Sequence, residues 1–519
     1  MENLWQNYTQ KFTASVQYIP VRGPITIHQK VFFLIGIAAI VVYVSRLLKS
    51  FKRTGRESNK VAENLEENDS SSSISISIKD EATPQTPPQP PKPRHPTVTH
   101  DIALRHVCMV FLVLCYYFLC DYWHYFPRAE RIYNRDLFFF LIAVLFIVNA
   151  VYTGHLAPDG GNHDKLLNRD QTEEWKGWMQ VMFVWYHYYK AAETYNMIRI
   201  FIACYVWMTG FGNFSFYWIR KDFSLRRIFN SLFRLNFLVL ITCMVTNNPY
   251  MLYYICAMHT FWYLSVYAMM RPFHQYNENP KVMGFKFLVY FLVVFIIFDV
   301  PGVATTLFRP FGCVLNFKDS IHEWVFRSTL DHYATLFGML CAYFHPNTEA
   351  SLRHINASSK SHFIITSISI VVFGVNYIWY KNVFVLNKFA YNKLHPYTFF
   401  IPMLSYIFLR NSYPLLRRWH CGLFGYLGKI TLETYISQLH IYLIQDAKGL
   451  LVYFRGYPML NFLVNSVIYI FMSNVLFKAT LSLNAYIFPA DYHKMLKNIS
   501  KIFVGFLVAY MLVAVLSFI

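Results

Sequence analysis

Three polar residues share one face of an apolar segment. Lys176, Gln180 and His187 lie within TEEWKGWMQVMFVWYHYYKAAE, and the histidine is eleven positions after the lysine. An α-helix turns by about 100° per residue, so these side chains point the same way. A charged side chain at the centre of a membrane helix costs roughly 2.5–3.5 kcal/mol, so it normally faces a protein interior or a wet cavity. This face is therefore the first candidate for chemistry.

The imidazole of His187 suits acyl transfer to an alcohol. Its ordinary pKa is near 6.5, so at neutral pH it can accept a proton from a hydroxyl group. The alternative is a buried structural histidine that is hydrogen-bonded to a neighbouring helix. The spacing alone does not separate these two interpretations.

Basic residues flank and enter a later apolar run in IRKDFSLRRIFNSLFRLN. Arg227 and Arg234 are seven residues apart and so share a helix face. Guanidinium groups stay charged and bind phosphates in a bidentate manner, which suits the phosphates of coenzyme A. Contact with lipid headgroups is the alternative, and it is the better interpretation for Arg220 and Lys221.

Two further segments carry polar residues at helical spacing. In GKITLETYISQLHIYL, Glu433 and His440 share a face, which either takes part in catalysis or forms a polar seam that stabilises the bundle. In SIHEWVFRSTLDHYATLF, we expect Arg327 and Asp331 to form a pair four residues apart. That pair either binds an acceptor sugar or is structural, and His395 in YNKLHPYTFFIP is a similar candidate with less support.

One tempting motif is discounted. Asp121 and His124 imitate the Asp-x-x-His block of small serine esterases, but no Gly-Asp-Ser nucleophile block lies upstream. The chain also contains no P-loop, no GxGxxG and no HExxH motif.

The composition indicates a membrane protein. Of 519 residues, 55% are hydrophobic and 14% are charged, whereas soluble domains carry about 25% charged residues. The net charge of +19 arises from short basic clusters between apolar runs, which is typical of cytosolic loops and not of nucleic-acid binding. The nine cysteines have no paired spacing, so we expect neither a disulfide framework nor a metal site.

The apolar runs predict an all-α polytopic helix bundle with about 13–14 spans of about 20 residues each. The two weakest runs are 175–193 and 397–410, so the count can be as low as ten. The fourteen runs lie near residues 31–48, 103–123, 137–154, 175–193, 197–218, 228–246, 249–270, 283–299, 326–345, 362–380, 397–410, 422–445, 458–478 and 502–519.

Positive charges predict the orientation. The basic stretch RLLKSFKRTGR follows the first span and should stay in the cytosol, and the later loops on that side are basic too. The N-terminus is then lumenal, so Asn7 in Asn-Tyr-Thr can carry a glycan. Lys176 lies near the cytosolic end of its span, and His187 lies about 16 Å deeper at a rise of about 1.5 Å per residue.

Three segments follow from this pattern. Residues 1–48 form a short lumenal N-terminus with an uncleaved membrane anchor. Residues 49–100 form a Ser- and Pro-rich cytosolic linker that we expect to be disordered. Residues 101–519 form the multi-span domain.

Long motifs give the chain a family resemblance. The stretches LNRDQTEEWKGWMQVMFVWYHYYKAAE, AYFHPNTE, YNKLHPYTFFIP and LGKITLETYISQLHIYLIQ resemble the reduced-wall-acetylation proteins of plants. Those belong to the wider capsule-type polytopic O-acetyltransferases, which include the animal sialate O-acetyltransferase. The resemblance covers nearly the whole chain from PITIHQKVFFLIGI onward.

The resemblance implies a multi-pass Golgi protein that uses acetyl-CoA to O-acetylate polysaccharides or glycans. Lys176 and His187 look like the basic-x10-His signature of bacterial membrane O-acyltransferases, in which the histidine is the proposed base. Arg227 and Arg234 match basic positions of the plant pattern, whereas Arg226 does not. Lys176, Arg227 and Arg234 are thus expected to contact acetyl-CoA.

His187 is expected to act as a general base or to accept the acetyl group briefly, with Glu433 or His440 as its orienting or relay group. Arg327 with Asp331 is expected to bind the acceptor. The capsule and sialate relatives carry an N-terminal lumenal esterase-like domain that this sequence lacks. The acetyl group is therefore expected to reach the glycan directly or through a separate lumenal O-acetyltransferase. A transporter of acetyl-CoA without acyl-transfer chemistry and a non-catalytic scaffold for lumenal transferases are the alternatives.

Overall fold

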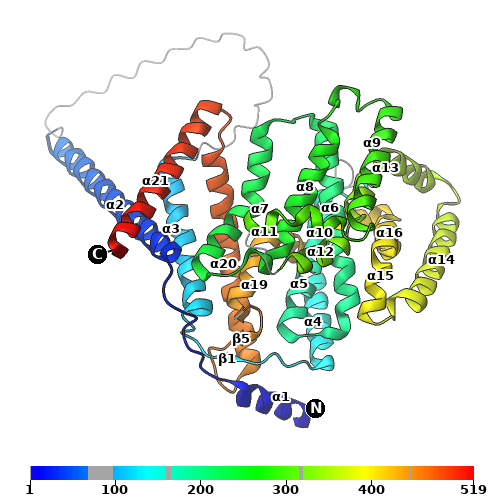
Figure 1. Ribbon diagram of the computed structural model, residues 1–519, viewed down its shortest axis with the longest axis horizontal. Coiled ribbons are helices and arrows are strands. Elements are labelled where there is room, and N and C mark those ends of the chain that lie inside the picture. Colours follow the sequence, from blue (N-terminus) through cyan, green and yellow to red (C-terminus); the bar gives the residue numbers. More distant parts are fainter. Residues whose placement is uncertain (1, 68–97, 159–164, 315–319, 445, 519) are drawn as a thin grey trace. The chain divides into compact units, whose positions relative to one another are not determined.

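The computed structural model describes residues 2–67, 98–158, 165–314, 320–444 and 446–518 (Figure 1). This part of the chain is mostly α-helical, as predicted, and its strands are only two or three residues long. The first helices are α1 (Glu2–Ser15), α2 (Ile27–Glu67), α3 (His100–Tyr117), α4 (Arg135–Thr153), α5 (Arg169–Tyr189), α6 (Tyr195–Arg220), α7 (Leu225–Thr246), α8 (Tyr254–Met270) and α9 (Pro280–Phe298). The later ones are α10 (Val303–Phe308), α11 (Phe311–Val314), α12 (Ile321–Thr329), α13 (Ala334–Ala357), α14 (Ser361–Trp379), α15 (Lys388–Thr398), α16 (Phe400–Asn411), α17 (Pro414–Arg418), α18 (Gly422–Lys429), α19 (Thr431–Ile441), α20 (Pro458–Ile487) and α21 (Tyr492–Phe518).

Within the described residues, nine helices are long and apolar enough to cross a membrane. They coincide with nine of the fourteen predicted runs. The other five runs correspond to α5, α8, α13, α16 and the α18–α19 pair, which are shorter or carry more polar residues. These helices hold four of the predicted site residues, Lys176 and His187 on α5 and Glu433 and His440 on α19.

The chain divides into two compact units. One contains residues 1–24 and 114–477, and the other contains residues 25–113 and 478–519. The smaller unit takes residues from both ends of the predicted domain over 101–519 together with the first membrane helix. In this smaller unit, Phe32 packs against Phe111, and His28 Nδ1 lies 2.7 Å from the Tyr510 hydroxyl.

Helix α2 extends beyond the predicted anchor. It continues to Glu67, so residues 49–67 are helical where we expected disordered linker. Lys, Glu, Ala and Leu are frequent in VAENLEE and the residues before it, and these residue types favour a helix even without packing. The Ser- and Pro-rich part of the predicted linker, residues 68–97, lies outside the described residues.

Glycines hold the larger unit together at two helix crossings. A Cβ atom at Gly177 of α5 would lie 1.9 Å from the Phe424 carbonyl oxygen of α18, and one at Gly428 of α18 would lie 1.8 Å from the Glu173 carbonyl oxygen. A Cβ atom at Gly338 of α13 would likewise lie 2.2 Å from the Trp207 carbonyl oxygen of α6. Small residues let helix backbones approach closely in membranes, where lipid provides no hydrophobic drive for helix association.

Short strands and turns complete the larger unit. Strands β1 (Arg128–Ala129), β5 (Gly449–Leu451) and β4 (Leu443–Ile444) form one antiparallel sheet in that order. Strands β2 (Gly154–Leu156) and β3 (Trp419–Cys421) form another. A π-helical turn, η2 (Phe118–Tyr122), follows α3, and a 3-10 turn, η5 (Tyr250–Tyr253), precedes α8. These two turns carry side chains of the candidate site.

Candidate active site

The polar face of α5 is present, but its members have different surroundings. The Asn168 side chain caps the helix by accepting from the Gln171 N–H at 2.9 Å. Lys176 Nζ lies 2.7 Å from Glu173 Oε2, so an acidic neighbour accompanies this predicted phosphate ligand. Gln180 is buried.

His187 lies near the end of α5 that is predicted to face the lumen. Its ring meets the edge of Phe183 and lies beside Gln438 of α19. Within the described part of the chain, His187 Nδ1, Gln180 Nε2 and both amide atoms of Gln438 are buried and lack a hydrogen bond of good geometry. Buried polar groups are normally hydrogen-bonded, so a group of unsatisfied ones indicates a place for a polar ligand or water.

The structure joins two residues that were predicted to act separately. Arg234 of α7 forms a bidentate ion pair with Glu433 of α19, with the guanidinium Nη2 3.0 Å from Oε2 and Nη1 bonded to Oε1. The Glu433 side chain is fully buried, and that of Arg234 is 23% exposed. The buried Glu433 carboxylate is therefore balanced by Arg234, the residue that we expected to bind acetyl-CoA.

His440 of α19 occupies the centre of a buried hydrogen-bonded chain. Its Nδ1 lies 2.9 Å from Asp121 Oδ2 of η2, and its Nε2 lies 2.6 Å from the Tyr253 hydroxyl of η5. All three side chains are fully buried. The Tyr117 ring stacks on the imidazole with 4.9 Å between centroids. A histidine held between a carboxylate and a hydroxyl can take the hydroxyl proton while the carboxylate stabilises the resulting imidazolium.

A hydrogen-bonded path leads outward from Asp121. The Asn248 amide donates to Asp121 Oδ2 at 3.3 Å, and its carbonyl oxygen accepts from Arg22. Arg22 also forms an ion pair with Asp446 at 2.5 Å. The Arg22 side chain is 22% exposed and that of Asp446 is 35% exposed, so the path runs from a buried histidine to a partly exposed ion pair.

The basic hinge between α6 and α7 is ordered by local contacts. The Ser224 side chain caps α7 by accepting from the Arg227 N–H at 3.3 Å, and the Arg227 guanidinium lies 4.0 Å above the Phe216 ring. Hydrogen bonds from the Ser224 backbone N–H and hydroxyl lower the pKa of Asp222 below its ordinary value. Arg227 is half-buried, and Arg220 is exposed.

The expected Arg327–Asp331 pair is not formed. Arg327 instead pairs with Glu323 one turn earlier, at 2.7 Å, because α12 ends at Thr329 before the helical spacing reaches Asp331. Asp331 is fully buried and pairs with Arg199 of α6 at 2.6 Å and with His395 of α15 at 3.3 Å. Two separately noted candidates, Asp331 and His395, thus meet in one buried cluster.

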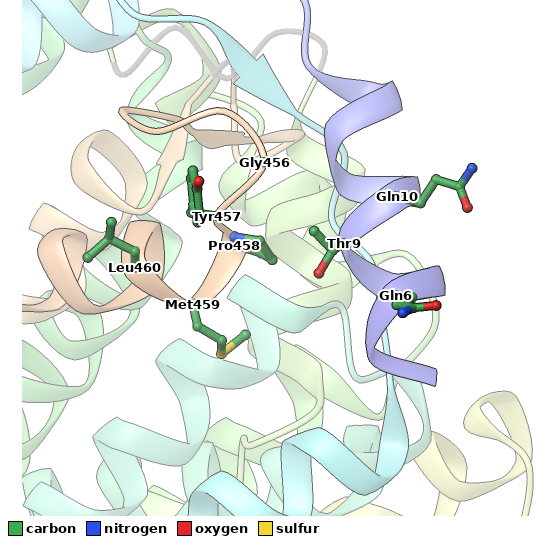
Figure 2. Close-up of a pocket in the computed structure, with 8 residues that line it drawn as sticks. All are labelled: Gln6, Thr9, Gln10, Gly456, Tyr457, Pro458, Met459 and Leu460. Atoms are coloured by element: carbon green, nitrogen blue, oxygen red, sulfur yellow. The ribbon is translucent and has the colours of Figure 1, made fainter. Parts of the chain in front are cut away.

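One hollow in the larger unit has no carboxylate, histidine or basic side chain in its described lining. Gln6, Thr9 and Gln10 of α1 line it together with Gly456, Tyr457, Pro458, Met459 and Leu460 (Figure 2). Its volume is about 550 Å³. Neutral amides and apolar groups do not supply a base, so the hollow is a weaker candidate for chemistry than the buried α5–α19 region.

Sequence reasoning missed Asp121, Tyr253 and Asn248. Asp121 was set aside with His124 because their spacing imitates an esterase motif, whereas Asp121 in fact contacts His440. An available signal was the burial cost of a carboxylate within a predicted span. Tyr253 and Asn248 are neutral and give no comparable signal.

Comparison with known proteins decides the family. Residues 20–500 match the family described as "10 TM Acyl Transferase domain found in Cas1p". The chain belongs to this acyltransferase family. It is also 32% identical over 408 residues to the N-acetylneuraminate (7)9-O-acetyltransferase of Danio rerio, which covers 75% of this chain. The chain spans about half of that relative's length, because the match covers 51% of it. No solved structure matches the chain significantly.

The Cas1p-type chain offers no obvious metal centre in its described residues. No group of three or more His, Cys, Asp or Glu side chains there is arranged to hold a metal ion. Its candidate chemistry consists of the α5 face, the Arg234–Glu433 pair and the Asp121–His440–Tyr253 chain.

Proposed function

We propose that this Cas1p-family protein is a membrane O-acetyltransferase that takes acetyl groups from cytosolic acetyl-CoA and supplies them to hydroxyl groups of glycans in the Golgi lumen. The observation that carries the proposal is the set of buried polar atoms where His187 of α5 meets Gln438 of α19, which make no hydrogen bond of good geometry. The acetyltransferase named among the comparisons acts on N-acetylneuraminate, which supports a sugar hydroxyl as the acceptor.

Acetyl-CoA is the donor in this proposal, and its phosphates meet the basic residues on the predicted cytosolic side. Arg227 and Lys176 are assigned to these phosphates because both lie near the cytosolic ends of their helices. Glu173, beside Lys176 at 2.7 Å, keeps the lysine in place until the stronger phosphate charge replaces it. Arg234 has the same assignment, but its bidentate contact with Glu433 means that the pair moves or binds as a unit.

His187 acts as the general base toward the acceptor hydroxyl in this scheme. Its position near the predicted lumenal end of α5 suits an acceptor that arrives from that side. His440, which Asp121 positions, relays a proton toward the lumen, and Glu433 holds the charge of Arg234. Because these groups are buried, the site excludes the water that would otherwise hydrolyse the activated acetyl group.

Arg327 is assigned to the acceptor. Its guanidinium lies 4.0 Å above the Tyr254 ring and its side chain is 31% exposed, and a cation beside an aromatic ring suits a polar sugar. Asp331 has a structural role in this scheme, because it is fully buried in its ion pair with Arg199. The protein sits among membrane lipids, and a separate lumenal esterase-like O-acetyltransferase is a further candidate acceptor of the acetyl group.

Asn7 is the proposed glycosylation site. It lies on α1 and its side chain is exposed, and the predicted topology places it in the lumen. Digestion with an N-glycosidase should reduce the apparent mass of the protein, and Asn7→Gln should remove that shift.

The test of the proposed function uses purified protein, labelled acetyl-CoA and a sialylated or neutral glycan acceptor. We expect His187→Gln to reduce acetyl transfer by about 10²–10⁴-fold, the usual contribution of a general base. The matched control is His259→Gln. His259 also lies in a buried part of the bundle, and its Nδ1 is 2.7 Å from the Thr209 hydroxyl. Full activity in a folded His187→Gln protein would show that the assignment is wrong.

A further inference from the structure

Tyr253 occupies the position that a nucleophile occupies in a hydrolase triad. Its hydroxyl lies 2.6 Å from His440 Nε2, and His440 Nδ1 on the opposite edge of the ring lies 2.9 Å from Asp121 Oδ2. Hydroxyl, imidazole and carboxylate thus follow one another in a line, as they do in nucleophilic acyl transfer. The three residues come from three separate elements, η5, α19 and η2, so no single helix dictates this alignment.

Neighbouring side chains fix each member of the line. The Tyr117 ring stacks on His440 at an interplanar angle of 25°, and the Tyr117 hydroxyl bonds to Ser437 Oγ one turn away at 2.6 Å. The Asn248 amide reaches both ends of the line, at 3.3 Å from Asp121 Oδ2 and 3.5 Å from the Tyr253 hydroxyl. Preorganised groups of this kind are a requirement of an acyl-transfer site, because small displacements cost large factors in rate.

The phenol has the right leaving-group chemistry for an intermediate between a thioester and a sugar ester. A tyrosine phenol is more acidic than an aliphatic sugar hydroxyl and is the better leaving group of the two. An acetyl group on a phenol oxygen therefore keeps much of the acyl-transfer potential of a thioester. It can then pass to a sugar hydroxyl in a favourable step.

We propose that Tyr253 is the nucleophile that carries the acetyl group between acetyl-CoA and the lumenal acceptor, with His440 as its base and Asp121 as the residue that positions His440. The inference rests on the proposed function and names a covalent intermediate for it. It also gives the protein two stages, one toward the donor and one toward the acceptor.

In the first stage, the Tyr253 oxygen attacks the thioester carbonyl carbon while His440 Nε2 takes the phenol proton. The carbon–sulfur bond breaks, and the leaving thiolate takes that proton from His440, so coenzyme A departs as a thiol. In the second stage, the acceptor hydroxyl oxygen attacks the ester carbonyl while His187 takes its proton. The bond to the Tyr253 oxygen breaks, and His187 returns the proton to that oxygen.

The experiment is acetyl trapping on the full-length protein. The protein in detergent is mixed with labelled acetyl-CoA in the absence of acceptor, quenched in acid, digested and analysed by mass spectrometry. We expect up to one acetyl group per chain on the Tyr253 peptide, no such label in Tyr253→Phe, and unchanged labelling in Tyr263→Phe. Tyr263 is the matched control because it is also a buried tyrosine, on α8, and its hydroxyl bonds to Tyr217 at 2.9 Å.

A second variant keeps the test decisive if Tyr253→Phe does not fold. His440→Gln leaves Tyr253 in place, and we expect it to slow labelling at least about 100-fold. Equal labelling in His440→Gln, label on another residue, or glycan acetylation by folded Tyr253→Phe within a few-fold of the unmodified protein would each overturn the inference while leaving the proposed function intact. Failure of the unmodified protein to consume acetyl-CoA even with acceptor would overturn both.

Discussion

Two buried carboxylate–histidine pairs in the larger unit differ in what surrounds the carboxylate. Asp331 accepts from Arg199 at 2.6 Å and from His395 at 3.3 Å. Asp121 accepts from His440 at 2.9 Å and from the neutral amide of Asn248 at 3.3 Å. Both carboxylates are fully buried. One difference between them is the neighbour of the carboxylate, which is a charged guanidinium at Asp331 and a neutral amide at Asp121.

That difference separates a structural pair from a reactive one. The Arg199 charge balances Asp331, so His395 gains little by becoming charged and its other ring nitrogen bonds to the Tyr391 hydroxyl at 3.0 Å. Beside Asp121 the Asn248 amide is neutral, so the His440 imidazole can supply a positive charge next to the carboxylate. A carboxylate that stabilises an imidazolium assists proton transfer, whereas one already paired with a guanidinium mainly holds helices together.

The largest effect is expected at the reactive pair. Asp121→Asn should reduce acetyl transfer on the order of 10³-fold or more, since it removes the charge that orients His440 and stabilises its protonated form. The folded protein should persist, because Asn keeps the shape of Asp. Turnover is compared with the unfolding temperature of the same detergent sample. A loss of folding with normal turnover per folded molecule would make this pair structural too.

The structural pair should respond in the opposite way. Asp331→Asn leaves the buried Arg199 charge uncompensated, which costs about 3–5 kcal/mol of folding free energy. We expect a large drop in the unfolding temperature and in the yield of monodisperse protein, with turnover per folded molecule within a few-fold of normal. The double substitution Arg199→Met with Asp331→Leu should recover part of the stability, since it removes both charges. A catalytic collapse without destabilisation would contradict the comparison.

A helix crossing on the helix that carries Arg199 gives a smaller effect. Gly338→Ala places a methyl group 2.2 Å from the Trp207 carbonyl oxygen, where α13 crosses the helix that carries Arg199. Overpacking of this kind costs typically 1–3 kcal/mol, which a thermal-shift assay detects. Gly212→Ala is the control, because a Cβ atom there meets nothing within 4 Å. Equal unfolding temperatures for both variants would show that the crossing is not tightly packed.

The smallest effect is expected from the outer end of the Asp121 path. Arg22→Gln removes the ion pair with Asp446 and the positive charge next to Asn248. We expect a few-fold decrease in turnover and little change in stability, because the Arg22 side chain is 22% exposed and interacts partly through water. The matched control is Arg353→Gln, because Arg353 also forms an ion pair, with Glu349 on the same helix. This variant should leave turnover unchanged.

The two pairs also mark what the sequence can and cannot predict. Helical spacing placed Glu433 and His440 on one face, and hydropathy located every helix that carries the site. The partner of His440 could not be predicted, because Asp121 is 319 positions away along the chain and no local sequence pattern connects the two residues. Arg327 was paired with Asp331 on spacing alone, and the end of α12 at Thr329 moved Asp331 to another partner. Local periodicity predicts faces, and tertiary contacts choose partners.

The most direct test of the account uses the protein in sealed proteoliposomes with its predicted cytosolic side outward. Labelled acetyl-CoA is added outside, and a glycan acceptor is enclosed. The account predicts free coenzyme A outside and labelled O-acetyl glycan inside, with both lost in His187→Gln and retained in His259→Gln. Intact labelled acetyl-CoA inside the vesicles, without glycan acetylation, would contradict it and identify a transporter instead.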